Sequence, residues 1–192
     1  FDPKDGTVHS ADARCLVCGQ VTQAKEVRGL SRQGKMDQRM IAVIFRHSDQ
    51  FGKRYRLATP SDRSTYAQAA EYLEERLAKW SSLERPIPSE KAPPEGHRSC
   101  SKAIYGMKTW DTFFNSRQKL ALLIFLESIR DNYDRIVAST RDVLDAAQVD
   151  TEKRKWTAEQ LSRAVMGYLA IILDRQADYC NNLCTWHNTG EK

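Results

Sequence analysis

The chain has 192 residues, of which 41% are hydrophobic and 29% are charged, and its net charge of +5 goes with a pI near 9.0. This composition is ordinary for a soluble globular protein. The longest apolar run, residues 120–126, is far shorter than the roughly 20 residues that a transmembrane helix needs, and no signal peptide is recognisable. We therefore expect a cytoplasmic protein without membrane contact, whose charge permits a nucleic-acid partner without requiring one.

Residues 1–82 are predicted to contain a small β-hairpin. The β-branched segment 40–45 and the alternating segment 55–59 have strand character, and a turn signal lies between them at residues 48–52. These features predict a hairpin across residues 39–59. Thr7-Val8 also has strand character.

Two helices are predicted in the same region. Residues 23–33 indicate a short helix that Gly34 ends. A second helix begins at Pro60, where Ser61 or Asp62 is the expected N-cap. One face of it is formed by apolar residues at spacings of three and four, namely Tyr66, Ala69, Ala70, Leu73, Leu77 and Trp80.

Residues 83–104 are predicted to form a linker or a long ordered loop. Prolines at this density cannot sustain a helix or a sheet ladder. The prolines are Pro86, Pro88, Pro93 and Pro94.

Residues 105–192 are predicted to form a helical module with two long antiparallel helices. Ser116 is a plausible N-cap for the first, residues 149–155 form a loop, and Thr157 with Gln160 fits a capping box that begins the second. The apolar seam of the first helix comprises Leu122, Leu126, Ile129, Tyr133, Ile136, Thr140, Val143 and Ala147. The stripe of the second comprises Leu161, Val165, Tyr168, Ile172 and Tyr179. The predicted fold class is α+β and predominantly helical.

The segment Cys15-Leu16-Val17-Cys18-Gly19 is the sharpest local signal in the sequence. Two cysteines separated by two residues can both reach one Zn²⁺ from a tight turn, and a following glycine relieves the backbone of that turn. The odd count of five cysteines also favours metal ligation over a disulfide framework. Two alternatives remain open, namely a chance pair of reduced thiols and a redox pair.

Tetrahedral zinc needs four ligands, so Cys15 and Cys18 would form an incomplete site alone. Other possible ligands, none of them at clean ribbon spacing, are Cys180, Cys184, His187, His97 and Cys100. Cys180 and Cys184 fit core packing better than ligation, because a buried free cysteine behaves as a small hydrophobic residue.

Basic residues gather near the first helix and the hairpin. Their side chains could track phosphates, although an ordinary solvated surface has the same appearance. The candidate nucleic-acid-binding residues are Arg28, Arg32, Lys35, Arg39, Lys53 and Arg54. No GxG cofactor loop, Walker A motif or HExxH motif is present.

Three stretches of the sequence resemble the Zn-ribbon-containing adenine-specific DNA methylases of bacteria and archaea, a family often linked to anti-phage gene clusters. The first stretch is Asp5-Gly6-Thr7-Val8 followed by Ala13-Arg14-Cys15-Leu16-Val17-Cys18-Gly19. The second runs from Tyr105-Gly106 to Trp110 and through Phe113-Phe114-Asn115-Ser116-Arg117-Gln118-Lys119-Leu120-Ala121-Leu122. The third is Leu173-Asp174-Arg175-Gln176-Ala177-Asp178-Tyr179 with Asn182-Leu183-Cys184-Thr185-Trp186. Leu16 departs from the family, which usually has proline there.

The resemblance implies that this chain is an internal piece of a longer methylase. In the family, the glycine-rich S-adenosylmethionine loop and the first Cys-x-x-Cys pair lie upstream, and the catalytic Asp-Pro-Pro-Tyr loop lies downstream. S-adenosylmethionine is therefore expected only in the full-length parent, and Cys15 with Cys18 would be half of a zinc ribbon. The rest of the parent chain and DNA are the expected partners.

Three functions are consistent with the sequence. The leading one is a non-catalytic accessory or target-recognition segment of an S-adenosylmethionine-dependent adenine-specific DNA methyltransferase. The alternative is a helical protein-interaction module that docks on the methylase core or on defence partners. A small stand-alone zinc enzyme is a third, but the sequence lacks three convincing ligands beside an open coordination position.

Overall fold

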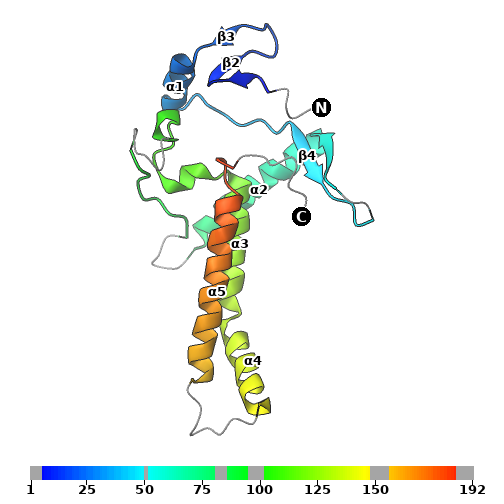
Figure 1. Ribbon diagram of the computed structural model, residues 1–192, viewed down its shortest axis with the longest axis vertical. Coiled ribbons are helices and arrows are strands. Elements are labelled where there is room, and N and C mark those ends of the chain that lie inside the picture. The colour runs from blue at the N-terminus through cyan, green and yellow to red at the C-terminus, as the bar shows by residue number, and fades with distance from the viewer. Residues whose placement is uncertain (1–5, 50–51, 81–85, 95–101, 148–155, 185–192) are drawn as a thin grey trace. The chain divides into compact units, whose positions relative to one another are not determined.

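A computed structural model of the chain describes residues 6–49, 52–80, 86–94, 102–147 and 156–184 (Figure 1). The fold is mixed α+β and predominantly helical, as the sequence predicts. The chain forms two compact units. Among the described residues, unit 1 comprises 6–49, 52–71, 88–94 and 102–113, and unit 2 comprises 72–80, 86–87, 114–147 and 156–184. Each region predicted from the sequence is one continuous stretch, whereas each unit combines stretches that alternate along the chain.

Unit 1 begins with a three-stranded antiparallel sheet in the order β1-β2-β3. Its strands are β1 (Val8–His9), β2 (Asp12–Arg14) and β3 (Val21–Thr22). Ser10 and Ala11 join β1 to β2 with φ of 51° and 75°, a backbone conformation that normally favours glycine or asparagine. The sequence indicated a strand at Thr7-Val8 but not the two strands that flank the Cys-x-x-Cys turn.

Helix α1 (Ala24–Arg32) follows the sheet and confirms the short helix predicted there. Its N-cap Gln23 makes no side-chain capping bond. Instead, the amide of Ala24 donates to the carboxylate of Asp12 on β2, at 2.7 Å. This bond satisfies one of the free amides at the helix start and joins α1 to the strand that leads into the Cys-x-x-Cys turn.

The predicted hairpin is confirmed by strands β4 (Ala42–Phe45) and β5 (Arg54–Leu57), which pair antiparallel. Ala42 lies opposite Leu57, and Phe45 lies opposite Arg54. Part of the predicted turn, residues 50–51, lies outside the described residues.

Helix α2 (Pro60–Ala78) begins where the sequence predicts, but its cap is Thr59 and not Ser61 or Asp62. The amide of Asp62 donates to the Thr59 hydroxyl at 3.4 Å, and the amide of Thr59 donates to the Asp62 carboxylate at 2.8 Å. This reciprocal pair is a capping box, and Pro60 takes the first helical position, where its missing N–H has no cost. The predicted apolar face of α2 is its less exposed side, with Leu73 only 2% exposed.

The described part of the proline-rich segment is an ordered loop. Lys91 forms a β-bridge with Thr109, and the amide of Ala92 donates to the carbonyl of Lys108 at 2.9 Å. Two 3₁₀ turns follow, η1 (Lys102–Tyr105) and η2 (Trp110–Phe113).

The segment after η1 packs closely against α1 at Gly106. This residue has a φ of +80°, and a Cβ built on it would lie 2.6 Å from the backbone oxygen of Ser31. Ser31 is itself buried, and its hydroxyl donates to the carbonyl of Val27 at 2.8 Å. Only glycine fits both the backbone conformation and the close approach.

We expect Gly106→Ala to destabilise the protein by more than about 1 kcal/mol, because alanine is strained at positive φ and would push α1 away. Gly29→Ala is the matched control. Gly29 lies inside α1 with open space around it, so alanine there should be neutral or stabilise by up to about 1 kcal/mol. Urea unfolding followed by circular dichroism measures both changes. Equal stability of the two variants would contradict the close approach at Gly106.

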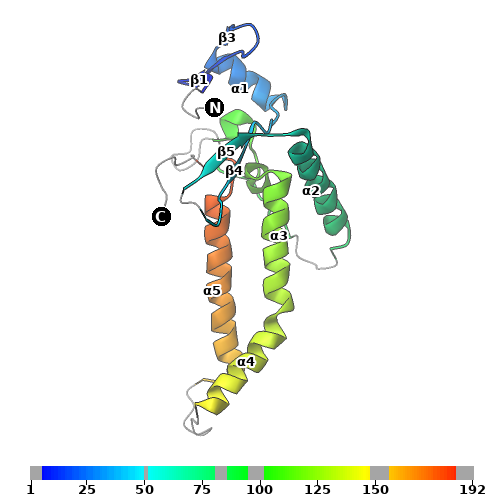
Figure 2. The same ribbon diagram turned by 90° about the vertical axis from the view of Figure 1, so that its right-hand side faces the viewer.

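Unit 2 is built on three further helices, α3 (Ser116–Asp131), α4 (Tyr133–Ala146) and α5 (Ala158–Tyr179). Helix α5 packs along α3 and α4 in the antiparallel direction (Figures 1 and 2). The single long helix predicted before α5 is interrupted at Asn132, whose ψ is 7° and whose side chain donates to the carbonyl of Ser128 at 2.8 Å. Side-chain bonding of this kind competes with regular helix geometry. Six residues of the predicted seam are shielded, but Val143 and Ala147 are exposed.

The N-cap of α3 is Asn115 and not Ser116. The Asn115 side chain accepts from the amide of Gln118 at 3.0 Å, and the Gln118 side chain accepts from the amide of Asn115 at 2.9 Å. At the start of α5, Thr157 and Gln160 form the same reciprocal pair, which confirms the predicted capping box. Ser116 therefore occupies the first helical position of α3.

The predicted apolar stripe of α5 is wrong beyond Leu161. Helix α5 turns a different face toward its neighbours, formed by Ala158, Ser162, Met166, Leu169, Leu173 and Ala177. Ser162 is fully buried, and its hydroxyl lies 3.2 Å from that of Thr140 on α4. Both faces of α5 are apolar, so periodicity alone could not select the inner one.

We expect Asn115→Ala to lower the free energy of unfolding by about 1 kcal/mol, since a free helix amide loses its acceptor. Ser116→Ala is the control and should change it by no more than about 0.5 kcal/mol. Chemical denaturation measures both values. A larger loss of unfolding free energy in Ser116→Ala than in Asn115→Ala would identify Ser116 as the N-cap, as the sequence predicted.

In the part of the chain that the structure describes, no helix is both long and apolar enough to cross a membrane.

Candidate functional site

Cys15 and Cys18 lie on a tight turn, as predicted; the turn connects β2 to β3, and both residues are exposed. Two backbone bonds close this turn: the Cys15 amide donates to the Gln20 carbonyl at 2.8 Å, and the Gly19 amide donates to the Cys15 carbonyl at 3.0 Å. Gly19 has a φ of +73°, which a residue with a Cβ rarely adopts. We call residues 15–19 the knuckle.

Hydrogen bonds from the knuckle backbone favour the thiolate form of Cys15. The amide of Val17 donates to the Cys15 Sγ at 3.4 Å. Hydrogen bonds from the backbone of Cys18 and of Val17, and then from the Cys18 side chain, lower the pKa of the Cys15 thiol below its usual value. Metals bind the thiolate form, so this arrangement favours ligation at neutral pH.

The knuckle supplies two of the four ligands that a tetrahedral zinc site needs. Among the described residues, no group of three or more His, Cys, Asp or Glu side chains is placed to hold a metal ion. The donor chemistry therefore suits zinc, but the number of donors is half of what a structural site requires. Leu16 and Val17, at the tip of the turn, are 81% and 95% exposed.

The sequence also offered other candidate ligands. Cys180 and Cys184 belong to unit 2, whereas the knuckle belongs to unit 1. The Cys184 thiol donates to the carbonyl of Tyr179 at 2.9 Å, and Cys180 accepts from Gln176 at 2.9 Å. Cys184 is exposed, so the core packing expected for it is wrong. His97, Cys100 and His187 lie outside the described residues.

The structure places the predicted nucleic-acid residues in two groups within unit 1. Arg28 and Arg32 lie one turn apart on α1, while Lys35 and Arg39 lie on the segment after that helix. Of these four residues, only Arg28 and Arg32 therefore lie on the helix. Arg28 is half-buried, and its Nε is buried without a hydrogen-bond partner among the described residues, so it is less accessible to a phosphate than the other three.

Lys53 and Arg54 form the second group, at the start of β5, where Arg54 is exposed and Lys53 is half-buried. The neighbouring Arg56 has a structural role instead. Its guanidinium contacts the Asp62 carboxylate through two bonds of 2.6 and 2.8 Å. This ion pair and the Thr59 hydroxyl hold the pKa of Asp62 well below its usual range. Arg56 thus joins the hairpin to the capping box of α2.

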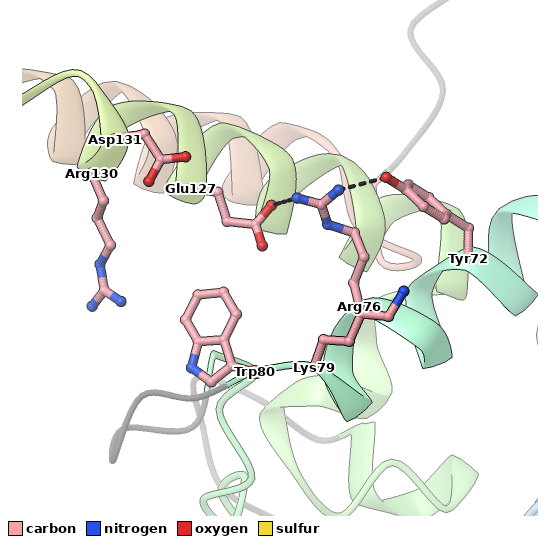
Figure 3. Close-up of a pocket in the computed structure, with 7 residues that line it drawn as sticks. All are labelled: Tyr72, Arg76, Lys79, Trp80, Glu127, Arg130 and Asp131. Atoms are coloured by element: carbon pink, nitrogen blue, oxygen red, sulfur yellow. Dashed lines mark hydrogen bonds and ion pairs between the residues drawn. The ribbon is translucent and has the colours of Figure 1, made fainter.

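A pocket of about 480 Å³ in unit 2 was missed from the sequence (Figure 3). It lies between the C-terminal part of α2 and the last turns of α3, and its lining comprises Tyr72, Arg76, Lys79, Trp80, Glu127, Arg130 and Asp131. The available signal was the spacing of Tyr72, Arg76 and Lys79 by four and three residues, which places them on one helix face. That signal could not indicate that α3 would lie opposite.

Searches of family models, curated proteins and solved structures found no match to this chain. The relation to the adenine-specific methylases therefore stays a prediction that depends on the residues quoted above.

We expect Cys15 to react with iodoacetamide at lower pH than an ordinary thiol, whose pKa is about 8.5, since its hydrogen bonds favour the thiolate. Val17→Pro removes one donor to Sγ and should move the midpoint of the pH–rate profile upward. Leu16→Pro is the control, because its amide is not among the groups that lower this pKa. Peptide mass spectrometry measures the rates. An unshifted midpoint in Val17→Pro would count against the role of that amide.

Proposed function

We propose that this chain is an accessory, target-recognition segment of an S-adenosylmethionine-dependent adenine-specific DNA methyltransferase, and that it does not transfer methyl groups alone. The parent would act in the cytoplasm. The observation that carries the proposal is the knuckle, whose amide donors face Cys15 and whose glycine follows Cys18. The resembling family has a zinc-ribbon pair at this place in its sequence.

In this proposal, Cys15 and Cys18 would hold one side of a Zn²⁺ ion, and a second pair from the rest of the parent chain would hold the other. Zinc would supply a structural cross-link between the two segments, since a closed four-ligand site stabilises a fold and does no chemistry. The exposed tip residues Leu16 and Val17 support this arrangement, because a surface that awaits a second polypeptide segment can remain apolar.

DNA binding would fall to the exposed cations of unit 1. Arg32, Lys35 and Arg39 follow one another along α1 and the segment after it. Cations on such a surface neutralise phosphates and release counterions, which gives sequence-independent affinity with strong salt dependence. The resemblance supports DNA as the polyanion.

The direct test is binding of the 192-residue chain to duplex DNA at several salt concentrations. We expect the triple variant Arg32→Glu, Lys35→Glu, Arg39→Glu to bind more weakly and to lower the salt slope by roughly one for each phosphate that is no longer neutralised. The control carries the same charge change elsewhere, as Arg63→Glu, Arg135→Glu, Arg163→Glu. Equal weakening in both triple variants would show that only net charge matters and would contradict the assigned surface.

Two further results bear on the methylase assignment. Methyl transfer from S-adenosylmethionine to DNA by this chain alone would contradict a non-catalytic segment. In the gene, a glycine-rich cofactor loop before the segment and an Asp-Pro-Pro-Tyr loop after it are expected. Their absence from the reading frame would refute the family.

One observation favours the second candidate, a helical interaction module that docks on the methylase core or on defence partners. Tyr168, Ile171 and Ile172 on the outer face of α5 are each at least 63% exposed. Contiguous exposed apolar side chains of this kind often mark protein-interaction sites. A chain that binds no duplex even at low salt, but whose association with a partner is abolished by Ile172→Asp, would favour this module over the DNA-binding segment.

A further inference from the structure

The pocket of unit 2 contains a fixed ion pair that shapes one of its sides. The guanidinium of Arg76 on α2 bonds to the carboxylate of Glu127 on α3, and it also donates to the hydroxyl of Tyr72 at 2.5 Å (Figure 3). The carboxylate and then the hydroxyl raise the pKa of Arg76. Arg76 and Glu127 therefore form one side of the pocket, and the buried Nε of Arg76 has no hydrogen-bond partner among the described residues.

Trp80 supplies the aromatic surface of the pocket. It lies two residues after the end of α2 and is half-buried. The guanidinium carbon of Arg130 lies 5.8 Å from the centre of its ring. A cation at this distance is attracted to the ring face and helps to hold its orientation. Figure 3 shows Trp80 and Arg130 on the same side of the pocket.

The charges of the lining favour an anionic ligand. Three cations, Arg76, Lys79 and Arg130, stand against two carboxylates, Glu127 and Asp131, which leaves an excess of one positive charge. Arg76 and Glu127 pair with each other, and the other charged residues of the lining are Lys79, Arg130 and Asp131.

These features together select a class of ligand. Five of the seven lining side chains are charged, so a purely apolar ligand would leave them poorly solvated. Cations near a helix C-terminus stabilise the helix in any protein, so Lys79 and Arg130 alone indicate no ligand. A tryptophan ring that lines the same pocket adds a stacking surface, which a simple anion would not use. A planar base joined to a phosphate can use both the tryptophan ring and the cations.

We propose that this pocket binds an unpaired nucleotide, with its base stacked on Trp80 and its phosphate near Lys79 and Arg130. Asp131 can accept a hydrogen bond from a base amino group. The nucleotide can be free or part of a single-stranded nucleic acid. A base inside a duplex does not expose the face that Trp80 needs. The inference goes beyond the proposed function and does not rest on it, since duplex binding was assigned to residues of unit 1.

The test measures the affinity of the 192-residue chain for a fluorescein-labelled DNA single strand of about 12 nucleotides by anisotropy, a length within the range of known single-strand sites. We expect Trp80→Ala to weaken binding by at least about fivefold, the fold-change that corresponds to the weakest base–aromatic stacking. Trp80→Phe keeps a ring and should bind within about twofold of the unchanged protein. Arg130→Gln should also weaken binding, by removing a cation beside the phosphate.

Matched controls separate the pocket from general effects. Trp156 is 52% exposed in unit 2 but does not line the pocket, so Trp156→Ala should leave binding unchanged. Arg163→Gln, an equal charge change on the exposed side of α5, should also leave it unchanged. Far-UV circular dichroism checks folding, and Trp80→Phe keeps the test decisive if Trp80→Ala unfolds.

Competition identifies the source of the nucleotide. Displacement of the labelled strand by dAMP supports a free mononucleotide, and displacement by unlabelled single strand alone supports a nucleic acid. Three results would overturn the inference: no binding of strand or dAMP, equal affinity of Trp80→Ala and the unchanged protein, or displacement by inorganic phosphate as effective as by dAMP. Duplex binding by the Trp80 variants should stay unchanged, so failure here is distinguishable from failure of the duplex surface in unit 1.

Discussion

Side chains accept hydrogen bonds from the first amides of α1, α2, α3 and α5, and two of these caps join the helices to the small sheets. A helix begins with amides that have no partner within the helix, and each one left unsatisfied destabilises it. Asp12 accepts for α1, Thr59 with Asp62 for α2, Asn115 for α3 and Thr157 for α5. The Asp12 bond reaches from β2 to α1, and Arg56 reaches from β5 to Asp62. Capping therefore joins the small sheets to the helices and sets where the knuckle lies relative to α1.

This dependence on helix ends matters because the core is small. In the described part of the chain, the buried hydrophobic residues are Leu73, Phe113, Leu120, Leu123 and Ala158. Many other large apolar side chains are exposed, among them Val17 on the knuckle and Ile172 on α5. Apolar burial supplies most of the stability of a folded domain. Burial of these exposed side chains against a partner would therefore add stability.

The knuckle and the pocket differ in how many of the groups needed by a ligand are already in place. At the knuckle, hydrogen bonds to Cys15 already favour its thiolate, which is the form that a metal ion would bind. Among the described residues, the knuckle supplies only two of the four ligands that a tetrahedral zinc site needs. At the pocket, Arg76 and Glu127 form an ion pair along one side, and Trp80 with Arg130 forms a surface that a planar ligand can use. The two sites lie in different units and rest on separate observations.

The sequence by itself determined the features that depend on neighbouring residues. The hairpin, the short helix after residue 23, the start of α2 and the Thr157–Gln160 capping box follow from turn chemistry and local hydrogen bonding, and the structure confirms them. The exposed Cys15–Cys18 turn belongs to the same group, because its geometry is closed by bonds within six residues. The caps at Thr59 and Asn115 were misplaced by one or more residues, since several adjacent polar side chains could each have served.

Only the tertiary structure decided the features that depend on distant residues. Both faces of α5 are apolar, so packing against α3 and α4 selected the inner one. The requirement for glycine at position 106 comes from the backbone of Ser31, which no local pattern can reveal. The pocket exists because Glu127 and Arg130 on α3 lie opposite Arg76 and Trp80. In each case the deciding interaction joins residues far apart in the chain, and local periodicity carries no information about such interactions.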